Sequence, residues 1–255
     1  YHHIKSTKDN KVLNLNILNI KTFEDQILYL KKKYNIIGDD DLCEILLTKK
    51  VPKKPSFVLT FDDGYKDHYN YVFPLLIKHK LKGIFYPTSK IFDKNYLLDV
   101  NKIQLILGKN RNKKKLLNYI FKEIKKFHNK NQNQLNLKKI NLKSRYDSKE
   151  TIMIKRLLQS HLEEKLRKKI INRLFNHYFG KENKKFVSKF YISRANALEM
   201  YNNGMSFGIH GSNHYWLNSM DYKNQENEIR SSIDKLNKIK ILKSNFSICY
   251  PYGAY

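Results

Sequence analysis

Hydrophobic and polar residues alternate along the chain in segments that predict both helices and strands. Apolar positions recur at helical spacing in residues 22–33, behind a capping Thr, and in residues 39–47, whose acidic first turn suits the helix dipole. Short apolar runs at 57–61, 83–86 and 205–210 instead predict buried strands. Strands separated by helices indicate a parallel sheet, with functional groups at the carboxyl ends of its strands. The same patterns predict helices at 71–80 and 221–240 and a last strand at 246–250.

One long region departs from this alternation. Residues 101–185 are helix-patterned, apart from a polar segment at 129–143 that predicts a loop. We therefore expect an α/β domain formed by residues 1–100 and 186–255, with residues 101–185 as a helical insertion. The strands outside the insertion are too few for a closed barrel of about eight, so we expect the barrel to be incomplete at its C-terminus.

The charge of the chain is strongly basic and unevenly distributed. The formal net charge is +27, and residues 101–190 hold 26 Lys and Arg against 6 Asp and Glu. This field favours an anionic polymer or an acidic lipid surface as a partner of residues 101–185. Biased composition is the alternative, because Lys, Asn, Ile and Tyr are abundant and Ala occurs three times. No nucleic-acid motif and no apolar run of about 20 residues occurs, so we expect neither specific nucleic-acid recognition nor a membrane span.

Two adjacent carboxylates close the strand predicted at 57–61. Asp62 and Asp63 are followed by Gly64, which lets the backbone turn so that both side chains face one cavity. Adjacent carboxylates repel each other unless they share a cation or a proton, so this strand end is a candidate site. An ordinary turn that caps the next helix is the alternative.

A pair of histidines and an aromatic loop follow two later strands. His210 and His214 lie four residues apart, which places both imidazoles on one side if the segment turns helically. Two His and one carboxylate form a metal-binding face with open positions for water and substrate. Exposed surface histidines are the alternative. After the last strand, Pro251 and Tyr252 form a stiff loop that can direct a ring or a backbone N–H into a cleft.

The order of these segments resembles that of polysaccharide deacetylases, the metal-dependent carbohydrate esterases that share the chitooligosaccharide-deacetylase homology domain. The matching motifs are Thr60-Phe61-Asp62-Asp63-Gly64, His210-Gly211-Ser212-Asn213-His214 and Tyr250-Pro251-Tyr252-Gly253. Tyr1-His2 is also similar to the Tyr-His that closes the first strand in the family. The resemblance implies an α/β fold, a distorted (β/α) barrel of the polysaccharide deacetylase type.

The resemblance also implies a single divalent metal, most often zinc, and a set of roles. The metal ligands would be Asp63, His210 and His214. Asp62 would be the base that takes a proton from a metal-bound water, while Pro251 and Tyr252 would shape the acetyl pocket. The backbone N–H of Tyr252 would help to hold the oxyanion. The implied reaction is hydrolysis of N-acetyl groups from amino sugars of a surface polysaccharide or its precursor, which favours the cell envelope or the surface of the cytoplasmic membrane.

Two departures from the family pattern keep an alternative open. Cys249 stands where many members have an Arg that tethers the catalytic Asp. The family's downstream motifs, which supply a pocket wall and a His as general acid, have no counterpart before the last residue, Tyr255. We therefore expect a truncated chain in which the general acid has no assigned residue. The alternative function is a catalytically impaired module that binds a carbohydrate or an anionic polymer.

Overall fold

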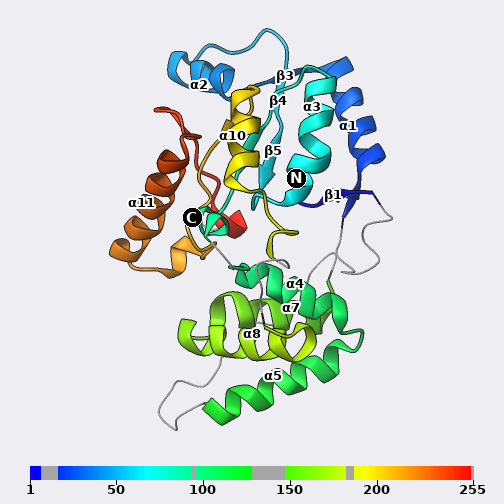
Figure 1. The fold of residues 1–255 in the computed structure, drawn as a ribbon, viewed down its shortest axis with the longest axis vertical. Helices are drawn as coiled ribbons and strands as arrows, with labels where there is room; N and C mark the ends of the chain where they lie inside the picture. Colours follow the sequence, from blue (N-terminus) through cyan, green and yellow to red (C-terminus); the bar gives the residue numbers. More distant parts are fainter. Residues whose placement is uncertain (7–16, 94–95, 128–146, 182–186, 254–255) are drawn as a thin grey trace. The chain divides into compact units, whose positions relative to one another are not determined.

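The chain forms two compact units in a computed structural model that describes residues 1–6, 17–93, 96–127, 147–181 and 187–253. Among these residues, the first unit holds 1–96 and 187–253, and the second unit holds 97–181. The domain boundaries expected from the sequence, at 100 and 186, stay a prediction. Each unit is described by itself below (Figure 1).

All named strands of the first unit pair in parallel, as an α/β fold requires. The strand pairs are β1 (Ile4–Lys5) with β2 (Leu18–Asn19), β3 (Asn35–Ile37) with β4 (Ser56–Val58), β5 (Thr60–Asp62) with β6 (Ile84–Tyr86), and β6 with β7 (Ser206–Phe207). The described strands form three separate sheets, of which the sheet β5-β6-β7 has three strands. The predicted α/β class is confirmed.

Two strands differ from the sequence prediction. The run at 57–61 is divided at Leu59, because the chain leaves β3 there and the Leu59 carbonyl already accepts a hydrogen bond from β6 (2.9 Å). The strand predicted at 246–250 is reduced to one parallel bridge between Ile209 and Ile248. It ends at once because the chain then turns into the Pro-containing loop.

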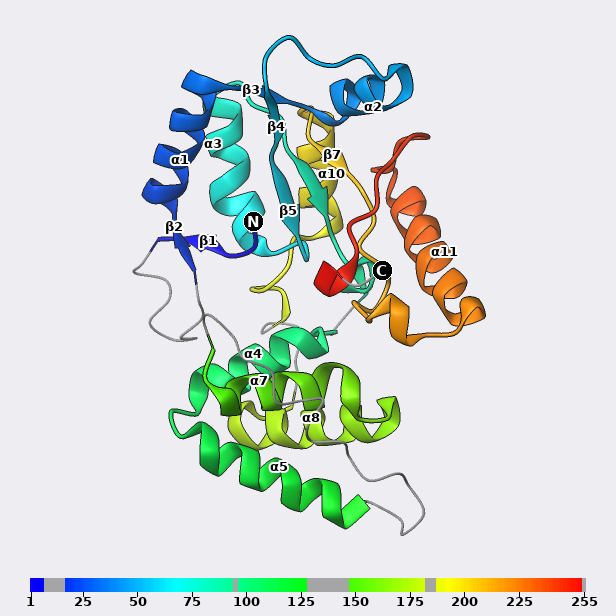
Figure 2. The same cartoon turned by 180° about the vertical axis from the view of Figure 1, so that it is seen from behind.

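Helices flank these strands. They are α1 (Ile20–Lys33), α2 (Asp39–Thr48), α3 (Phe73–Lys78), α10 (Arg194–Asn202) and α11 (Tyr222–Ile239), with shorter turns η2 (His68–Val72), η3 (Ser89–Phe92), η5 (Leu217–Ser219) and η6 (Pro251–Gly253). The side chains of Asn19 and Asp221 cap α1 and α11 by accepting from backbone N–H groups. α1 and α3 lie side by side, whereas α11 lies on the other side of the strands (Figures 1 and 2).

An aromatic layer forms the core of the first unit. Phe61, Phe85 and Phe207 occupy adjacent register positions on β5, β6 and β7, and all three are almost completely buried. The rings of Phe61 and Phe85 stack with centroids 4.8 Å apart. Because side chains alternate along a strand, Asp62 points to the face opposite to Phe61. The core therefore anchors the strand whose end carries the two carboxylates.

The described residues of the second unit form helices joined by short non-helical segments. It consists of α4 (Asp99–Lys109), α5 (Lys113–Phe127), α7 (Lys149–Arg156), η4 (Leu157–His161) and α8 (Glu164–Phe179). Apolar residues fill its core, including Ile103, Ile106, Leu157, Ile170 and Leu174. Glu123 of α5 is buried between Lys126 (2.6 Å) and Arg173 of α8 (2.7 Å). The loop predicted at 129–143 lies outside the described residues. In the described part of the chain, no helix combines the length and apolarity needed to cross a membrane.

Candidate metal centre

The two carboxylates lie where β5 ends. Asp62 is the last residue of β5, in register with Tyr86 of β6. Asp63 follows with a φ of 69°, and its N–H donates to the carbonyl of Tyr86 (3.0 Å). Gly64 also has a φ of 69°, and a Cβ at this position would lie 2.4 Å from Cδ1 of Ile91. Only glycine fits there, and the resulting turn directs Asp63 into the interior.

The histidines lie on the loop that follows β7. This loop is bent rather than helical, so the two imidazoles are not brought together by a helical turn; Gly211 and His214 have φ values of 69° and 61°. The backbone N–H groups of Ser89 and Lys90 donate to the carbonyls of Gly211 (3.1 Å) and Ser212 (3.2 Å). Contacts with η3 therefore hold the loop in a shape that a free helical turn would not adopt.

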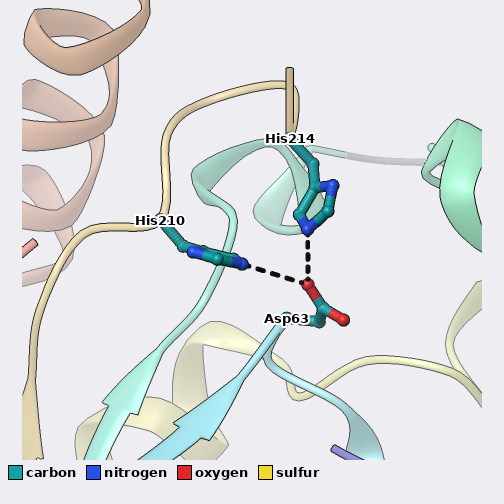
Figure 3. Close-up of side chains that lie close together, drawn as sticks. All are labelled: Asp63, His210 and His214. Atoms are coloured by element: carbon teal, nitrogen blue, oxygen red, sulfur yellow. Dashed lines mark ion pairs between the residues drawn. The ribbon is translucent and has the colours of Figure 1, made fainter. Parts of the chain in front are cut away.

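Asp63, His210 and His214 converge on one point (Figure 3). Oδ1 of Asp63 lies 3.1 Å from Nε2 of His214 and 3.4 Å from Nε2 of His210. The nitrogen and oxygen atoms that could bind a metal all lie within 4.8 Å of one another, and all three residues are buried. The structure thus brings together the three residues that the sequence singled out as metal ligands.

The electrostatics of this cluster favour a positive charge between the three side chains. Burial would raise the pKa of Asp63, but the charges and hydrogen bonds of His214 and His210 hold that pKa well below its usual range. Burial would lower the pKa of His210, but its interactions with Asp63 and with the side chain of Cys249 raise that pKa to about 10. A proton or a metal cation satisfies this preference equally well.

The donor atoms fit a divalent metal ion. The Nδ1–H of His210 donates to the carbonyl of Cys249 (2.7 Å), so Nε2, which faces Asp63, is the nitrogen that would bind a metal in place of a proton. This arrangement of a backbone carbonyl behind an imidazole is typical of metal-binding histidines. Two imidazole nitrogens and one carboxylate oxygen suit zinc and several other divalent ions.

Asp62 lies next to this cluster but is oriented differently. Its side chain is 17% exposed, against 3% for that of Asp63. The thiol of Cys249 donates to Oδ1 of Asp62 (3.6 Å). Cys249 thus contacts the candidate base through its side chain and His210 through its carbonyl. The position that differs from the family pattern still links the two.

His2 is a further ionisable side chain at the site, and the sequence analysis assigned no role to it. Its Nε2 lies 3.9 Å from Oδ2 of Asp62 and 4.0 Å from Oδ2 of Asp63, and its side chain is 59% exposed. The position follows from pairing of Tyr1 with β5, since the Tyr1 carbonyl accepts from the Asp62 N–H (3.0 Å). The similarity of Tyr1-His2 to a family motif was the available signal.

An aromatic wall borders the cluster on the side of His214. Tyr252 has a φ of 60°, and its ring meets that of His214 edge-on with centroids 4.6 Å apart. Trp216 stacks on Tyr252 at 5.1 Å, and Pro251 is buried. The predicted pocket residue Tyr252 therefore lies beside His214, a candidate metal ligand. Trp216 was missed because its only sequence signal was its place two residues after His214.

The fold and the site together define a class of hydrolase. Carboxylates and histidines converge at the carboxyl ends of parallel strands, in a cluster that can hold one divalent ion. The sequence matches the profile of the family described as polysaccharide deacetylase over residues 49–152 and 153–255. The chain belongs to the polysaccharide deacetylase family, whose metal-dependent members hydrolyse N-acetyl amide bonds of carbohydrates. No curated protein matches the sequence.

Solved structures support the same fold. The deacetylase PplD of Streptococcus pyogenes, solved in complex with acetate, is 19% identical with a TM-score of 0.56, over 100% of this chain and 73% of that chain. IcaB from Ammonifex degensii is 13% identical with a TM-score of 0.53, over 99% and 72%. A de-N-acetylase from Aggregatibacter actinomycetemcomitans is 14% identical with a TM-score of 0.54, over 100% and 78%.

Proposed function

We propose that this chain is a metal-dependent deacetylase that removes N-acetyl groups from amino sugars of a surface polysaccharide or its precursor. The observation that carries the proposal is the buried cluster of Asp63, His210 and His214, with Asp62 beside it. Buried groups of this kind are costly to maintain unless they bind a ligand or take part in a reaction. Family membership supplies the reaction class.

In this proposal, Asp63, His210 and His214 hold one divalent ion, and zinc is the ion we favour. A bound zinc ion supplies a Lewis acid that lowers the pKa of water and polarises a carbonyl. The donor set of two nitrogens and one oxygen supports this choice, although several divalent ions accept the same set. Burial of the three side chains excludes competing water from their other lone pairs.

Asp62 is the proposed base. The reaction adds water across the amide: Asp62 accepts a proton from the attacking water, whose oxygen bonds to the acetyl carbon. The carbon–nitrogen bond then breaks as the nitrogen takes up a proton, which leaves acetate and a free amine. The thiol of Cys249 holds one oxygen of Asp62 and leaves the other, Oδ2, on the side of His2. The N–H of Tyr252 is the proposed donor to the oxyanion.

His2 is the proposed donor of the proton that the leaving nitrogen needs. It lies about 4 Å from both carboxylates and is half-exposed, so a sugar nitrogen can reach its ring. Proton transfer from a positioned imidazole to a leaving group is a common form of general acid catalysis.

The test is acetate release from N-acetylglucosamine oligomers and from peptidoglycan by the native chain and by Asp62→Asn. We expect the substitution to lower kcat by roughly 10²–10⁴-fold, because the base is lost. Metal content measured on the same samples should stay at one ion per chain, since Asp62 is outside the cluster. Asp25→Asn, an exposed carboxylate of α1, is the matched control and should change neither quantity.

A second arm tests His2. His2→Gln should slow amide hydrolysis much more than hydrolysis of an activated aryl acetate, whose leaving group needs no proton. Equal losses on both substrates would argue against the acid role. Acetate release that is indifferent to Asp62→Asn would overturn the deacetylase mechanism, and a native chain that binds the oligomers without releasing acetate would favour the carbohydrate-binding module.

Two further proposals rest on the sequence. An anionic polymer or acidic lipid surface as partner of residues 101–185 is supported only by the excess of Lys and Arg. A place in the cell envelope, or at the surface of the cytoplasmic membrane, follows from the proposed substrate class.

A further inference from the structure

Glu228 is a buried carboxylate on the helix that packs against the histidine loop. It lies on the buried face of α11, with Ser232 and Leu236, and is only 4% exposed. A carboxylate in such a place is costly unless hydrogen bonds satisfy it. Its partners therefore indicate what it does.

Both oxygens of Glu228 bind a single residue of the His210–His214 loop. Oε1 accepts from the backbone N–H of Asn213, and Oε2 accepts from Nδ2 of the same Asn213 (2.7 Å). On the opposite side, Nζ of Lys90 donates to Oδ1 of Asn213 (2.8 Å). Asn213 is thus held between α11 and η3, one residue before a candidate metal ligand.

The hydrogen bonds among Lys90, Asn213 and Glu228 allow only one orientation of the Asn213 amide. Lys90 can only donate and the Glu228 carboxylate can only accept, so the Asn213 amide cannot rotate without losing both bonds. The carboxyl group also lies against Gly211, where a Cβ would be 3.1 Å from Oε1 of Glu228. The same side chain therefore binds the loop at Asn213 and packs closely against it at Gly211.

A second connection links α11 with η3, the two elements that hold Asn213. Asp93, which follows η3, forms an ion pair with Lys235 of α11. In addition, N–H groups of Ser89 and Lys90 donate to carbonyls of the loop. Hydrogen bonds thus join the helix, η3 and the loop, and Glu228 is a buried carboxylate among them.

We propose that Glu228 is a positioning residue of the metal centre. By binding Asn213 on two sides, it holds the strained loop, with His214 at positive φ, so that both imidazoles face Asp63. The proposal rests on the proposed metal centre. Replacing a residue that orients metal ligands without itself binding the metal typically weakens metal affinity by about 10–100-fold.

Glu228→Gln tests this role with almost no change in size. A carboxamide offers one acceptor and one donor where Asn213 presents two donors, so one bond must fail. We expect about 10–100-fold weaker binding of Co²⁺ and Zn²⁺ by chelator competition. The visible spectrum of bound Co²⁺, which reports its coordination geometry, should change as well.

A compensating double variant separates positioning from simple destabilisation. Combining Glu228→Gln with Asn213→Asp restores the pattern, since the new carboxylate accepts from Lys90 and from the new amide. The total charge equals that of the native chain. This double variant should recover most of the lost affinity and the native Co²⁺ spectrum. Glu226→Gln, an exposed position on the same helix, is the matched control and should leave both unchanged.

Each outcome decides between the two proposals. If the native chain binds neither ion at one per chain, the metal centre and the role of Glu228 both fall. If the native chain binds and Glu228→Gln binds equally well, only the role of Glu228 falls. A variant that loses thermal stability in chelator but keeps its metal affinity and spectrum would make Glu228 structural, and would overturn the proposal.

Discussion

The two units bury carboxylates in different ways. In the second unit, the buried Glu123 is neutralised by Lys126 and Arg173, whose side chains are 62% and 52% exposed. In the first unit, Asp63 faces two imidazoles that are buried with it. The first arrangement places the charge at the border of a helical core, where water reaches the partners. The second encloses all the charges, an arrangement suited to binding a cation.

Residues with a strained backbone are also unevenly distributed between the two units. In the described part of the chain, the non-glycine residues with positive φ are Lys49, Asp63, Lys80, His214, Lys240 and Tyr252. Asp63, His214 and Tyr252 belong to the candidate site, and Lys49 and Lys240 cap helices. All six lie in the first unit. Strained residues persist only where the surrounding structure fixes them, and they often mark functional sites.

The largest contrast is expected from replacing the two buried carboxylates. Asp63→Asn should abolish stoichiometric metal binding and acetate release, because an amide oxygen carries no charge to hold the ion. Glu123→Gln should cost only about 1 kcal/mol of stability, since its exposed partners regain water. Metal analysis and thermal unfolding in chelator measure both effects. Metal loss in Glu123→Gln, or retention in Asp63→Asn, would remove the contrast.

Replacing one glycine in each unit compares how tightly side chains pack around the backbone at the two positions. Gly64→Ala and Gly180→Ala both place a side chain at positive φ, which costs about 1–3 kcal/mol. A Cβ at 64 also meets Ile91 at 2.4 Å, whereas a Cβ at 180 has no neighbour within 4 Å. We expect Gly64→Ala to destabilise by about 1–3 kcal/mol more, from overpacking. Urea unfolding followed by circular dichroism gives the difference, and equal losses would mean that Ile91 yields easily.

The last prediction concerns His68, a fully buried imidazole of the first unit. Burial lowers its pKa to about 4, although its ring bonds to the His2 carbonyl. The unfolded chain protonates this side chain below its ordinary pKa of about 6.5, while the folded chain does not. Stability is therefore intact above pH 7 and falls as the pH drops towards 4, by about 2 kcal/mol between pH 7 and pH 5.

His68→Gln, which keeps a donor for the His2 carbonyl, should flatten this part of the stability curve. The exposed His177 of α8 provides the control, because His177→Gln should leave the curve as it is. Equal slopes for the native chain and His68→Gln, measured by urea unfolding at several pH values, would contradict the prediction.

The sequence predicted local features of the chain better than its pairings. Helical spacing located α1 and α11 to within two residues at each end, because caps and apolar stripes are local signals. It did not predict the break at Leu59, since a strand that changes partner keeps its apolar pattern.

The residues of the candidate site also differ in whether the local sequence could predict them. Its motif residues could be named because each follows a strand directly. His2, Trp216 and Glu228 could not, because pairing of Tyr1 with β5, ring stacking and helix packing bring them to the site. Their positions depend on contacts between segments far apart in the chain.

The stacking of Trp216 on Tyr252 has a practical consequence. Trp216 is the only tryptophan in the sequence, and its ring lies 5.1 Å from a ring that contacts a candidate metal ligand. When tryptophan is excited selectively, the emission therefore comes from Trp216 at the candidate site. The tryptophan fluorescence of the whole chain is therefore a local signal from the candidate site, and it needs no label.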